Sequence, residues 1–228
     1  MSLWGYDGVA WAELDRMTTD AMGAYSFSGV ALSANPFQPH YAILEADQSC
    51  APHYMFVLDP GTPIVLADID GTLTLSDDEL SMQIADGSYD PVENTAASTM
   101  MNAWADKGYV TVYLTARPHA FRAETRAWLD DHGFPPGPVV TANSLVFGDT
   151  ARTYKATWVS RITTDLGWEL AAAYGNADSD ITAYEDAGVP KDITFIIGEL
   201  AGMNGTQPIE NNDYTDHIAE FVEPYPDA

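Results

Sequence analysis

A short apolar run that ends in two carboxylates constrains the fold of this chain more than any other feature. The apolar segment 64–67 is followed directly by Asp68-Ile69-Asp70-Gly71-Thr72. An uninterrupted apolar run of this length is typical of a central parallel strand that is covered on both faces. In such sheets, ligand sites lie beyond the carboxyl ends of the strands. We therefore expect Asp68, Asp70 and the Thr72 hydroxyl to form part of such a site.

Helical and apolar segments alternate from Pro63 to the end of the chain, as a doubly wound α/β fold requires. Strands are predicted at residues 64–67, 109–114, 138–141, 170–174 and 193–197. Helices are predicted near residues 97–107, 121–132, 154–166, 179–187 and 214–222. The first helix has apolar side chains at the i, i+3, i+4 and i+7 spacing of a buried helix face. The sequence thus predicts a Rossmann-like parallel sheet over residues 61–228.

Residues 1–60 have a different composition, with aromatic residues between clusters of Gly, Pro, Asn and Asp. Short strands are predicted at Tyr25-Ser26-Phe27 with Val30, at residues 40–44 and at residues 54–58. About three strands cannot form a self-sufficient sandwich. We expect a small β-rich appendage that packs on the main domain, or the remnant of a truncated domain.

The charge of the chain limits its partners. There are 34 acidic and 9 basic residues, which gives a formal net charge of −25. Such a surface repels phosphate backbones, and no basic run is present, so we exclude nucleic acid as a partner. No apolar run reaches the roughly 18 residues that span a bilayer, so we expect no transmembrane segment.

Cysteine and histidine give little sign of a metal site or of a compartment. Cys50 is the only cysteine, and the histidines show no ligand spacing, so a thiolate metal cluster is excluded. An acid-rich, lysine-poor surface suits a soluble protein that is exported or that lives in a high-salt cytoplasm. Met1-Ser2-Leu3 resembles an expression scar, which leaves open that a leader was removed. Localisation and oligomeric state are not determined by the sequence.

The paired carboxylates indicate a divalent cation. Two neighbouring anions repel each other unless a cation or a shared proton intervenes, and oxygen ligands favour Mg²⁺ over zinc. The Asp-x-Asp-Gly-Thr spacing then suggests covalent phosphoryl transfer with Asp68 as the nucleophile. Asp and Gly are also ordinary turn residues after a strand, so the prediction depends on motifs further along the chain.

Thr115-Ala116-Arg117 follows the predicted strand 109–114. The Thr115 hydroxyl and the backbone N–H groups at Ala116 and beyond are suited to hold phosphoryl oxygens. Arg117 is predicted to contact the phosphate or to recognise the rest of the substrate. The alternative is a threonine that closes a strand and an arginine in a surface ion pair.

Lys155 is predicted at the start of the third helix, where a lysine opposes the helix dipole and therefore needs an anionic neighbour. We expect it to pair with Asp68 and the transferred phosphoryl group, although a solvated lysine is the simpler alternative. In Gly175-Asn176-Ala177-Asp178-Ser179-Asp180, we expect Asp180 to bind the cation directly or through water, with Asn176 in support. Asp178 is left open because it also suits a helix N-cap.

The order of these motifs, and their positions at the ends of predicted strands, resemble those of the haloacid dehalogenase (HAD) superfamily. The sequences of these motifs are similar to those of lipin catalytic domains and of the C-terminal domain of membrane-associated phosphatidylinositol transfer proteins. This likeness extends over about residues 54–222 and rests on Asp-Ile-Asp-Gly-Thr-Leu-Thr at 68–74, Tyr-Leu-Thr-Ala-Arg-Pro at 113–118, residues 128–138 and residues 174–184.

The lipin resemblance implies Mg²⁺-dependent hydrolysis of phosphatidic acid to diacylglycerol. In the transfer proteins the related domain is thought to bind phosphatidic acid, and its nucleophile position is often not Asp, so Asp68 favours an active enzyme. Thr115 stands where lipins usually have Ser, and Ala177 stands where they usually have Arg. No basic amphipathic helix is present, so recruitment to an anionic bilayer is opposed.

The functional prediction is a Mg²⁺-dependent phosphomonoester hydrolase with catalytic Asp68, Asp70, Thr115 and Lys155. Thr72, Ala116 and Arg117 are predicted to bind substrate, and Asp68, Asp70, Asn176 and Asp180 to bind metal. Only 47 residues separate Asp68 from Thr115, which is too few for a large cap, so phospholipid headgroups and peripheral membrane contact are compatible with the site. The alternatives are a non-catalytic module that binds phosphatidic acid and a phosphatase for soluble phosphomonoesters.

Overall fold

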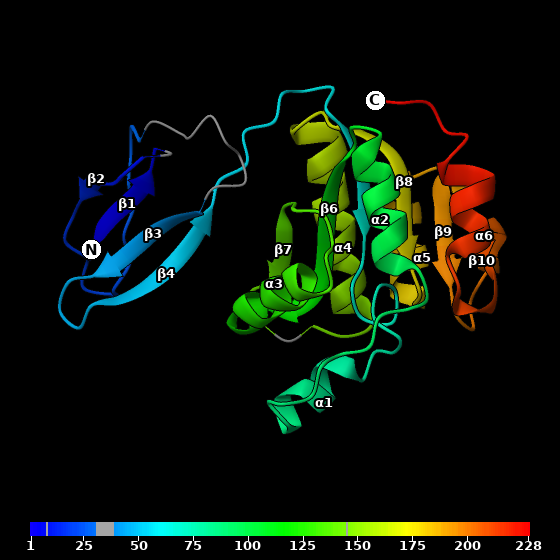
Figure 1. Cartoon of the computed structure of the whole chain (residues 1–228), viewed down its shortest axis with the longest axis horizontal. Helices are drawn as coiled ribbons and strands as arrows, with labels where there is room; N and C mark the ends of the chain where they lie inside the picture. Colours follow the sequence, from blue (N-terminus) through cyan, green and yellow to red (C-terminus); the bar gives the residue numbers. More distant parts are fainter. Residues whose placement is uncertain (8, 31–38, 145) are drawn as a thin grey trace. The chain divides into compact units, whose positions relative to one another are not determined.

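The computed structural model describes residues 1–7, 9–30, 39–144 and 146–228, which form two compact units, Met1–Leu58 and Asp59–Ala228 (Figure 1). The first unit is a four-stranded antiparallel sheet of order β2-β1-β3-β4. Its strands are β1 (Ser2–Tyr6), β2 (Trp11–Arg16), β3 (Pro39–Leu44) and β4 (Ser49–Tyr54). None of the described helices combines the length and the apolar character needed to cross a bilayer.

The strands of the first unit correct the sequence prediction. Residues 40–44 lie in β3 as expected, but Tyr25-Ser26-Phe27 forms no strand, and the strand expected over 54–58 ends at Tyr54. The Tyr25 ring instead packs against the Phe27 ring, with 5.5 Å between the ring centroids. The aromatic residues of this segment therefore pack locally and do not mark a strand. Strands β1 and β2 were not predicted. The β2 side chains are almost all exposed and show no alternating pattern.

The second unit is a six-stranded, all-parallel sheet of order β10-β9-β8-β5-β6-β7. Its strands are β5 (Pro63–Ala67), β6 (Val110–Pro118), β7 (Val139–Ala142), β8 (Glu169–Gly175), β9 (Thr194–Ile197) and β10 (Gln207–Ile209). Its α-helices are α1 (Glu79–Ala85), α2 (Ala97–Asp106), α3 (Arg122–Asp131), α4 (Asp149–Ser160), α5 (Asp178–Asp186) and α6 (Thr215–His217). Helix α4 continues as the π-helix η2 (Arg161–Asp165), and α6 continues as the π-helix η6 (Ile218–Val222). The predicted doubly wound α/β fold is therefore confirmed, with α1 and β10 as additions.

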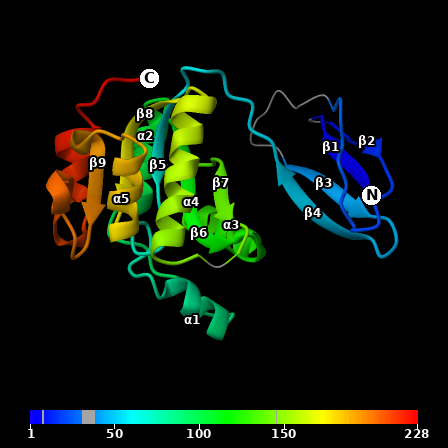
Figure 2. The ribbon, with the colours of Figure 1, turned by 180° about the vertical axis from the view of Figure 1, so that it is seen from behind.

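Helices cover both faces of this sheet, which explains the uninterrupted apolar run of β5. Val65 and Ala67 belong to a core with side chains of α2, α3 and η6. Ile64 and Leu66 point to the other face and belong to a core with side chains of α4 and α5. Figures 1 and 2 show these two helical layers from opposite sides.

The register of the central strands brings the predicted motifs to one edge. Ala67, the last residue of β5, pairs with Tyr113 of β6 and with Tyr174 of β8. Asp68 and Gly175 therefore lie at the same level of the sheet, one residue beyond Tyr113 of β6, and β6 itself continues to Pro118. Both views show α1 beyond this edge, separate from the helical layers.

Candidate active site

Three buried charged side chains meet at the carboxyl end of β5. Nζ of Lys155 lies 2.9 Å from Oδ1 of Asp68 and 2.5 Å from Oδ1 of Asp180. All three side chains are at most 5% exposed. The predicted pairing of Lys155 with Asp68 is present in the structure, and Asp180 joins it.

Burial and charge oppose each other in this cluster. Burial raises the pKa of the Asp68 carboxyl above its usual value, and the Lys155 ammonium opposes that increase. Burial by itself lowers the pKa of Lys155, but the carboxylates of Asp180 and Asp68 raise it above its ordinary value. One ammonium thus faces two carboxylates, and the cluster carries an excess of negative charge when all three groups are ionised.

Lys155 does not lie where the sequence prediction placed it. Helix α4 begins at Asp149, so Lys155 is its seventh residue, and the expected effect of the helix dipole was wrong. Lys155 lies on the buried face of α4, one turn after Ala151 and one turn before Val159. A buried lysine needs a carboxylate partner because desolvation of an unpaired ammonium is costly, and this requirement explains the pairing.

Asp180, which was predicted to bind the cation directly or through water, contacts Lys155 and two backbone N–H groups in this structure. Its Oδ1 contacts Lys155, and its Oδ2 accepts hydrogen bonds from the backbone N–H groups of Asn176 and Ala177 at 3.2 and 3.1 Å. The carboxylate is fully buried and does not line the pocket described below. Asp180 therefore supports Lys155 and caps α5, the role that had been left open for Asp178.

The amide of Asn176 is held between two side chains of the loop that follows β5. Its Oδ1 accepts a hydrogen bond from the Thr72 hydroxyl at 3.1 Å, and its Nδ2 donates to Oδ1 of Asp77 at 3.1 Å. Burial raises the pKa of Asp77, while the hydrogen bond from Asn176 opposes this. The loop approaches Asn176 closely because Gly71 has no Cβ: an added Cβ would lie 2.1 Å from Nδ2 of Asn176.

The sequence predicted that Thr72 binds the substrate, but Thr72 does not reach the pocket. Its side chain is fully buried, and its hydroxyl also lies 3.4 Å from Oδ2 of Asp68. It is thus placed to orient Asn176 and Asp68 and not to bind a substrate.

Asp70, Thr115 and Arg117 form a second group beside Asp68. Nε and Nη2 of Arg117 donate to the Asp70 carboxylate, and the shortest distance is 2.7 Å between Nη2 and Oδ1. The Thr115 hydroxyl is fully buried and donates to Oδ2 of Asp70 at 3.3 Å. In this structure both Thr115 and Arg117 therefore contact Asp70, whereas the sequence prediction had them contact the substrate.

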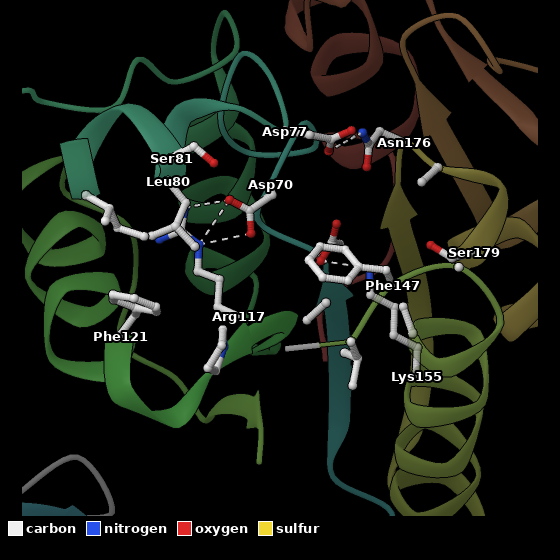
Figure 3. Close-up of a pocket in the computed structure, with 18 residues that line it drawn as sticks. Asp70, Asp77, Leu80, Ser81, Arg117, Phe121, Phe147, Lys155, Asn176 and Ser179 are labelled. Carbon is white, nitrogen blue, oxygen red and sulfur yellow. Dashed lines mark hydrogen bonds and ion pairs between the residues drawn. The ribbon is translucent and has the colours of Figure 1, made fainter. Parts of the chain in front are cut away.

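A pocket of about 340 Å³ opens over these groups, as Figure 3 shows. Its polar end is lined by Asp68, Asp70, Asp77, Arg117, Lys155 and Asn176. Its remaining wall is largely apolar and comes from α1, the end of β6 and the segment before α4: Leu80, Ile84, Ala116, Pro118, Phe121, Val146, Phe147 and Ala151. The pocket thus combines an anionic, hydrogen-bonding end with an apolar mouth.

Sequence reasoning missed Asp77, α1 and Phe147. Asp77 follows the Asp-x-Asp-Gly-Thr motif by only five residues, and this proximity is the one signal that would have found it. Ile84 of α1 and Phe147 are exposed, at 55% and 73%, so they belong to no periodic core stripe.

The residues present suit Mg²⁺. No three Asp, Glu, His or Cys side chains in the described parts of the chain are arranged to hold a metal ion. Mg²⁺, however, is usually held by one or two carboxylates, with water completing its ligands. The Asp68 carboxylate, the Asn176 amide oxygen and the backbone carbonyl of Asp70 are oxygen donors of the right kind. The site holds four carboxylates, Asp68, Asp70, Asp77 and Asp180, against the two cations Lys155 and Arg117. This charge balance favours a divalent cation.

Comparison with protein families gives a match over residues 65–198, more than half of the chain, to the family described as PITM 1-3, LNS2 domain. Human membrane-associated phosphatidylinositol transfer protein 3 is 28% identical over 217 residues, which cover 92% of this chain and 21% of that protein. Protein retinal degeneration B of Drosophila melanogaster is 27% identical over 213 residues, which cover 92% of this chain and 16% of that protein. The chain thus spans about a fifth or less of the length of these relatives.

Solved structures with a similar fold include phosphatases. An apo phosphoserine phosphatase aligns with a TM-score of 0.51 and 12% identity, over 70% of this chain and 98% of that chain. A HAD-like phosphatase from Mesorhizobium loti aligns with a TM-score of 0.50 and 15% identity, over 73% and 87% of the two chains. At these identities the comparison shows the fold alone; together with the family match it confirms the expected HAD-type, lipin-like domain.

Proposed function

Because the chain belongs to the LNS2 domain family of PITM 1-3 and its pocket joins a strand-end aspartate to a buried lysine, we propose that it is a Mg²⁺-dependent phosphomonoester hydrolase. The observation that carries this proposal is the contact of Asp68 with Lys155 at the carboxyl end of β5, inside an accessible pocket. Asp68 is the nucleophile and passes the phosphoryl group through an aspartyl-phosphate.

The proposed reaction has two steps. In the first, Asp70 enters in its protonated form. An oxygen of Asp68 bonds to phosphorus in line with the leaving oxygen, whose bond to phosphorus breaks, and Asp70 gives its proton to that oxygen and becomes a carboxylate. In the second, Asp70 takes a proton from water, which attacks phosphorus and releases phosphate from Asp68. Lys155 offsets the negative charge that gathers on the transferred group.

Mg²⁺, when bound, would shield the phosphoryl oxygens from the surrounding carboxylates and lower the barrier to attack by Asp68. Asp68, the Asp70 carbonyl and Asn176 are the residues proposed to hold it. Thr72 and Asp77 orient the Asn176 amide through the hydrogen bonds described above.

The mouth of the pocket favours an amphiphilic phosphate over a small polar ester. Leu80, Ile84, Phe121 and Phe147 present apolar surface next to the polar end. A phospholipid such as phosphatidic acid has an apolar part that would cover this surface, whereas a sugar phosphate has none. Hydrolysis of a phospholipid is therefore our preferred form of the proposal, and soluble phosphomonoesters are the alternative.

Phosphate release tests the proposal directly. Wild-type protein and Asp68→Asn are compared on phosphatidic acid vesicles and on para-nitrophenyl phosphate, each with and without Mg²⁺. We expect Mg²⁺-dependent release by the wild type, preferentially from vesicles, and no turnover by the folded variant. Vesicle binding without phosphate release would instead support a non-catalytic phospholipid-binding module. Near wild-type turnover by Asp68→Asn would exclude the mechanism.

A further inference from the structure

Arg117 approaches Asp70 with a geometry that leaves its guanidinium little freedom. Nε lies 3.0 and 2.9 Å from the two carboxylate oxygens of Asp70, and Nη2 lies 2.7 Å from Oδ1. The Arg117 side chain is 1% exposed, and the Asp70 side chain is 20% exposed. Asp70 therefore lines the pocket with a partly exposed side chain, while Arg117 holds both of its carboxylate oxygens.

The guanidinium is also held by α3. Nη1 donates to Oγ1 of Thr125 at 3.2 Å, and the Thr125 hydroxyl donates to the backbone carbonyl of Phe121 at 2.7 Å. The backbone N–H of Arg117 donates to Oγ1 of Thr115, whose hydroxyl donates to Asp70. The pair is thus tied to β6 on one side and to α3 on the other.

We propose that Arg117 is a positioning residue for Asp70 and not a ligand of the substrate phosphate. To bind a phosphate, the guanidinium would have to leave Asp70, and separating a buried bidentate pair is costly. Figure 3 shows Arg117 beside Asp70, on the side away from Lys155 and Asn176. The inference rests on the proposed function, since it assigns the partner of the residue that moves protons in that reaction.

The physical role is orientation. An aspartate side chain on a loop rotates readily, and proton transfer to a leaving oxygen requires the carboxylate within hydrogen-bond reach in a defined direction. A bidentate guanidinium fixes both carboxylate oxygens, which a lysine ammonium cannot do. Loss of the guanidinium should therefore slow the chemical step and leave phosphate binding unchanged.

Steady-state kinetics on para-nitrophenyl phosphate separate the two roles. For Arg117→Met, a positioning role predicts that kcat falls about 100-fold while KM changes less than about 3-fold. Adding Asp70→Asn to Arg117→Met should cause little further loss, because both changes remove the same function. Arg152→Met is the matched control, since it removes an exposed arginine paired with Asp186 outside the pocket. Unchanged kcat together with a KM increased by about 10-fold or more, or fully additive losses, would overturn the inference.

Binding of inorganic phosphate with Mg²⁺, measured by calorimetry, gives a readout that needs no turnover. We expect Arg117→Met to bind phosphate within about 3-fold of the wild type; a loss of about 10-fold or more would show that Arg117 is a ligand. If Arg117→Met does not fold, Thr125→Val removes the hydroxyl that contacts Nη1 and the Phe121 carbonyl and leaves the Arg117–Asp70 contacts in place. A fall in kcat with unchanged KM and unchanged phosphate binding would then support the inference, and a loss of phosphate binding of about 10-fold or more would overturn it. A wild type that hydrolyses no ester would refute the proposed function, while phosphate binding would still decide the role of Arg117.

Discussion

The ammonium of Lys155 lies 2.9 Å from Oδ1 of Asp68, and neither side chain is more than 5% exposed. This pair joins the first strand of the parallel sheet in sequence order to the buried face of α4. It links the stability of the domain to the chemistry proposed for it.

Substitution of Lys155 by methionine should destabilise the protein by about 3–5 kcal/mol, because Asp68 and Asp180 would remain buried without their cation. Urea unfolding measures the change. Lys191→Met is the matched control, because Lys191 pairs with Glu185 at the surface and its loss should have little effect. Equal stability of the two variants would contradict the buried triad.

Gly71 and Gly133 allow a test of the close approach of the loop to Asn176. Both have φ of +70°, but an added Cβ meets Nδ2 of Asn176 at 2.1 Å in Gly71 and nothing within 4 Å in Gly133. Gly133→Ala should lose about 1–2 kcal/mol of stability from backbone strain alone. Gly71→Ala should lose more stability than Gly133→Ala, and it should also lose phosphatase activity. Indistinguishable unfolding curves for the two variants would argue against the contact.

Asn176 should contribute to cation affinity. We expect Asn176→Ala to require about 10–100 times more Mg²⁺ for half-maximal phosphate release. Asp77→Ala should show a smaller shift in the same direction, since Asp77 orients the Asn176 amide. Mg²⁺ titrations followed by calorimetry and by phosphate release measure both shifts. Removal of metal by EDTA should abolish turnover, and Mg²⁺ should restore it. Full activity in EDTA would rule out the assignment.

His217 should make stability depend on pH. It lies among aromatic rings, 4.4 Å from the Phe195 ring and stacked on Phe221, and burial lowers its pKa from 6.5 to about 4. The unfolded state therefore binds a proton between pH 6.5 and 4 that the folded state excludes. The contribution of His217 to the free energy of unfolding is fully present above pH 6.5. It decreases as the pH falls towards 4, by about 3 kcal/mol in total.

His217→Gln removes this titration. The difference in unfolding free energy between pH 7 and pH 4.5 should be smaller in the variant than in the wild type by about 2–3 kcal/mol. Denaturant unfolding at the two pH values provides the measurement. The same loss of stability on acidification in both proteins would show that His217 titrates normally.

Phe147 should distinguish lipid from soluble substrates. Its ring is 73% exposed at the pocket mouth, so Phe147→Asp should lower phosphate release from phosphatidic acid vesicles about 10-fold or more and affect para-nitrophenyl phosphate less than about 2-fold. Met203→Asp, at a 43% exposed residue outside the pocket, is the control. A parallel decrease on both substrates would count against an amphiphilic ligand.

Local sequence patterns were sufficient to predict most helices and strands of the main domain. Met100 and Trp104 were predicted in the core of a helix, and both are fully buried on α2. Strand β2 and helix α1 escaped prediction because their exposed side chains lack a periodic apolar pattern. Tyr25 was assigned to a strand because aromatic residues favour strands, but its ring packs against Phe27 without one.

The sequence by itself determined the alternation of strands and helices and the placement of acidic and hydroxyl residues after particular strands. These features follow from short-range periodicity and from the rule that parallel strands end at one edge. Only the tertiary structure decided which of those residues meet: Asp180 with Lys155, Asn176 with Asp77, and Arg117 with Asp70. Each pair joins segments that are distant in the chain, and a contact of about 3 Å depends on strand register and helix packing, which no local pattern specifies.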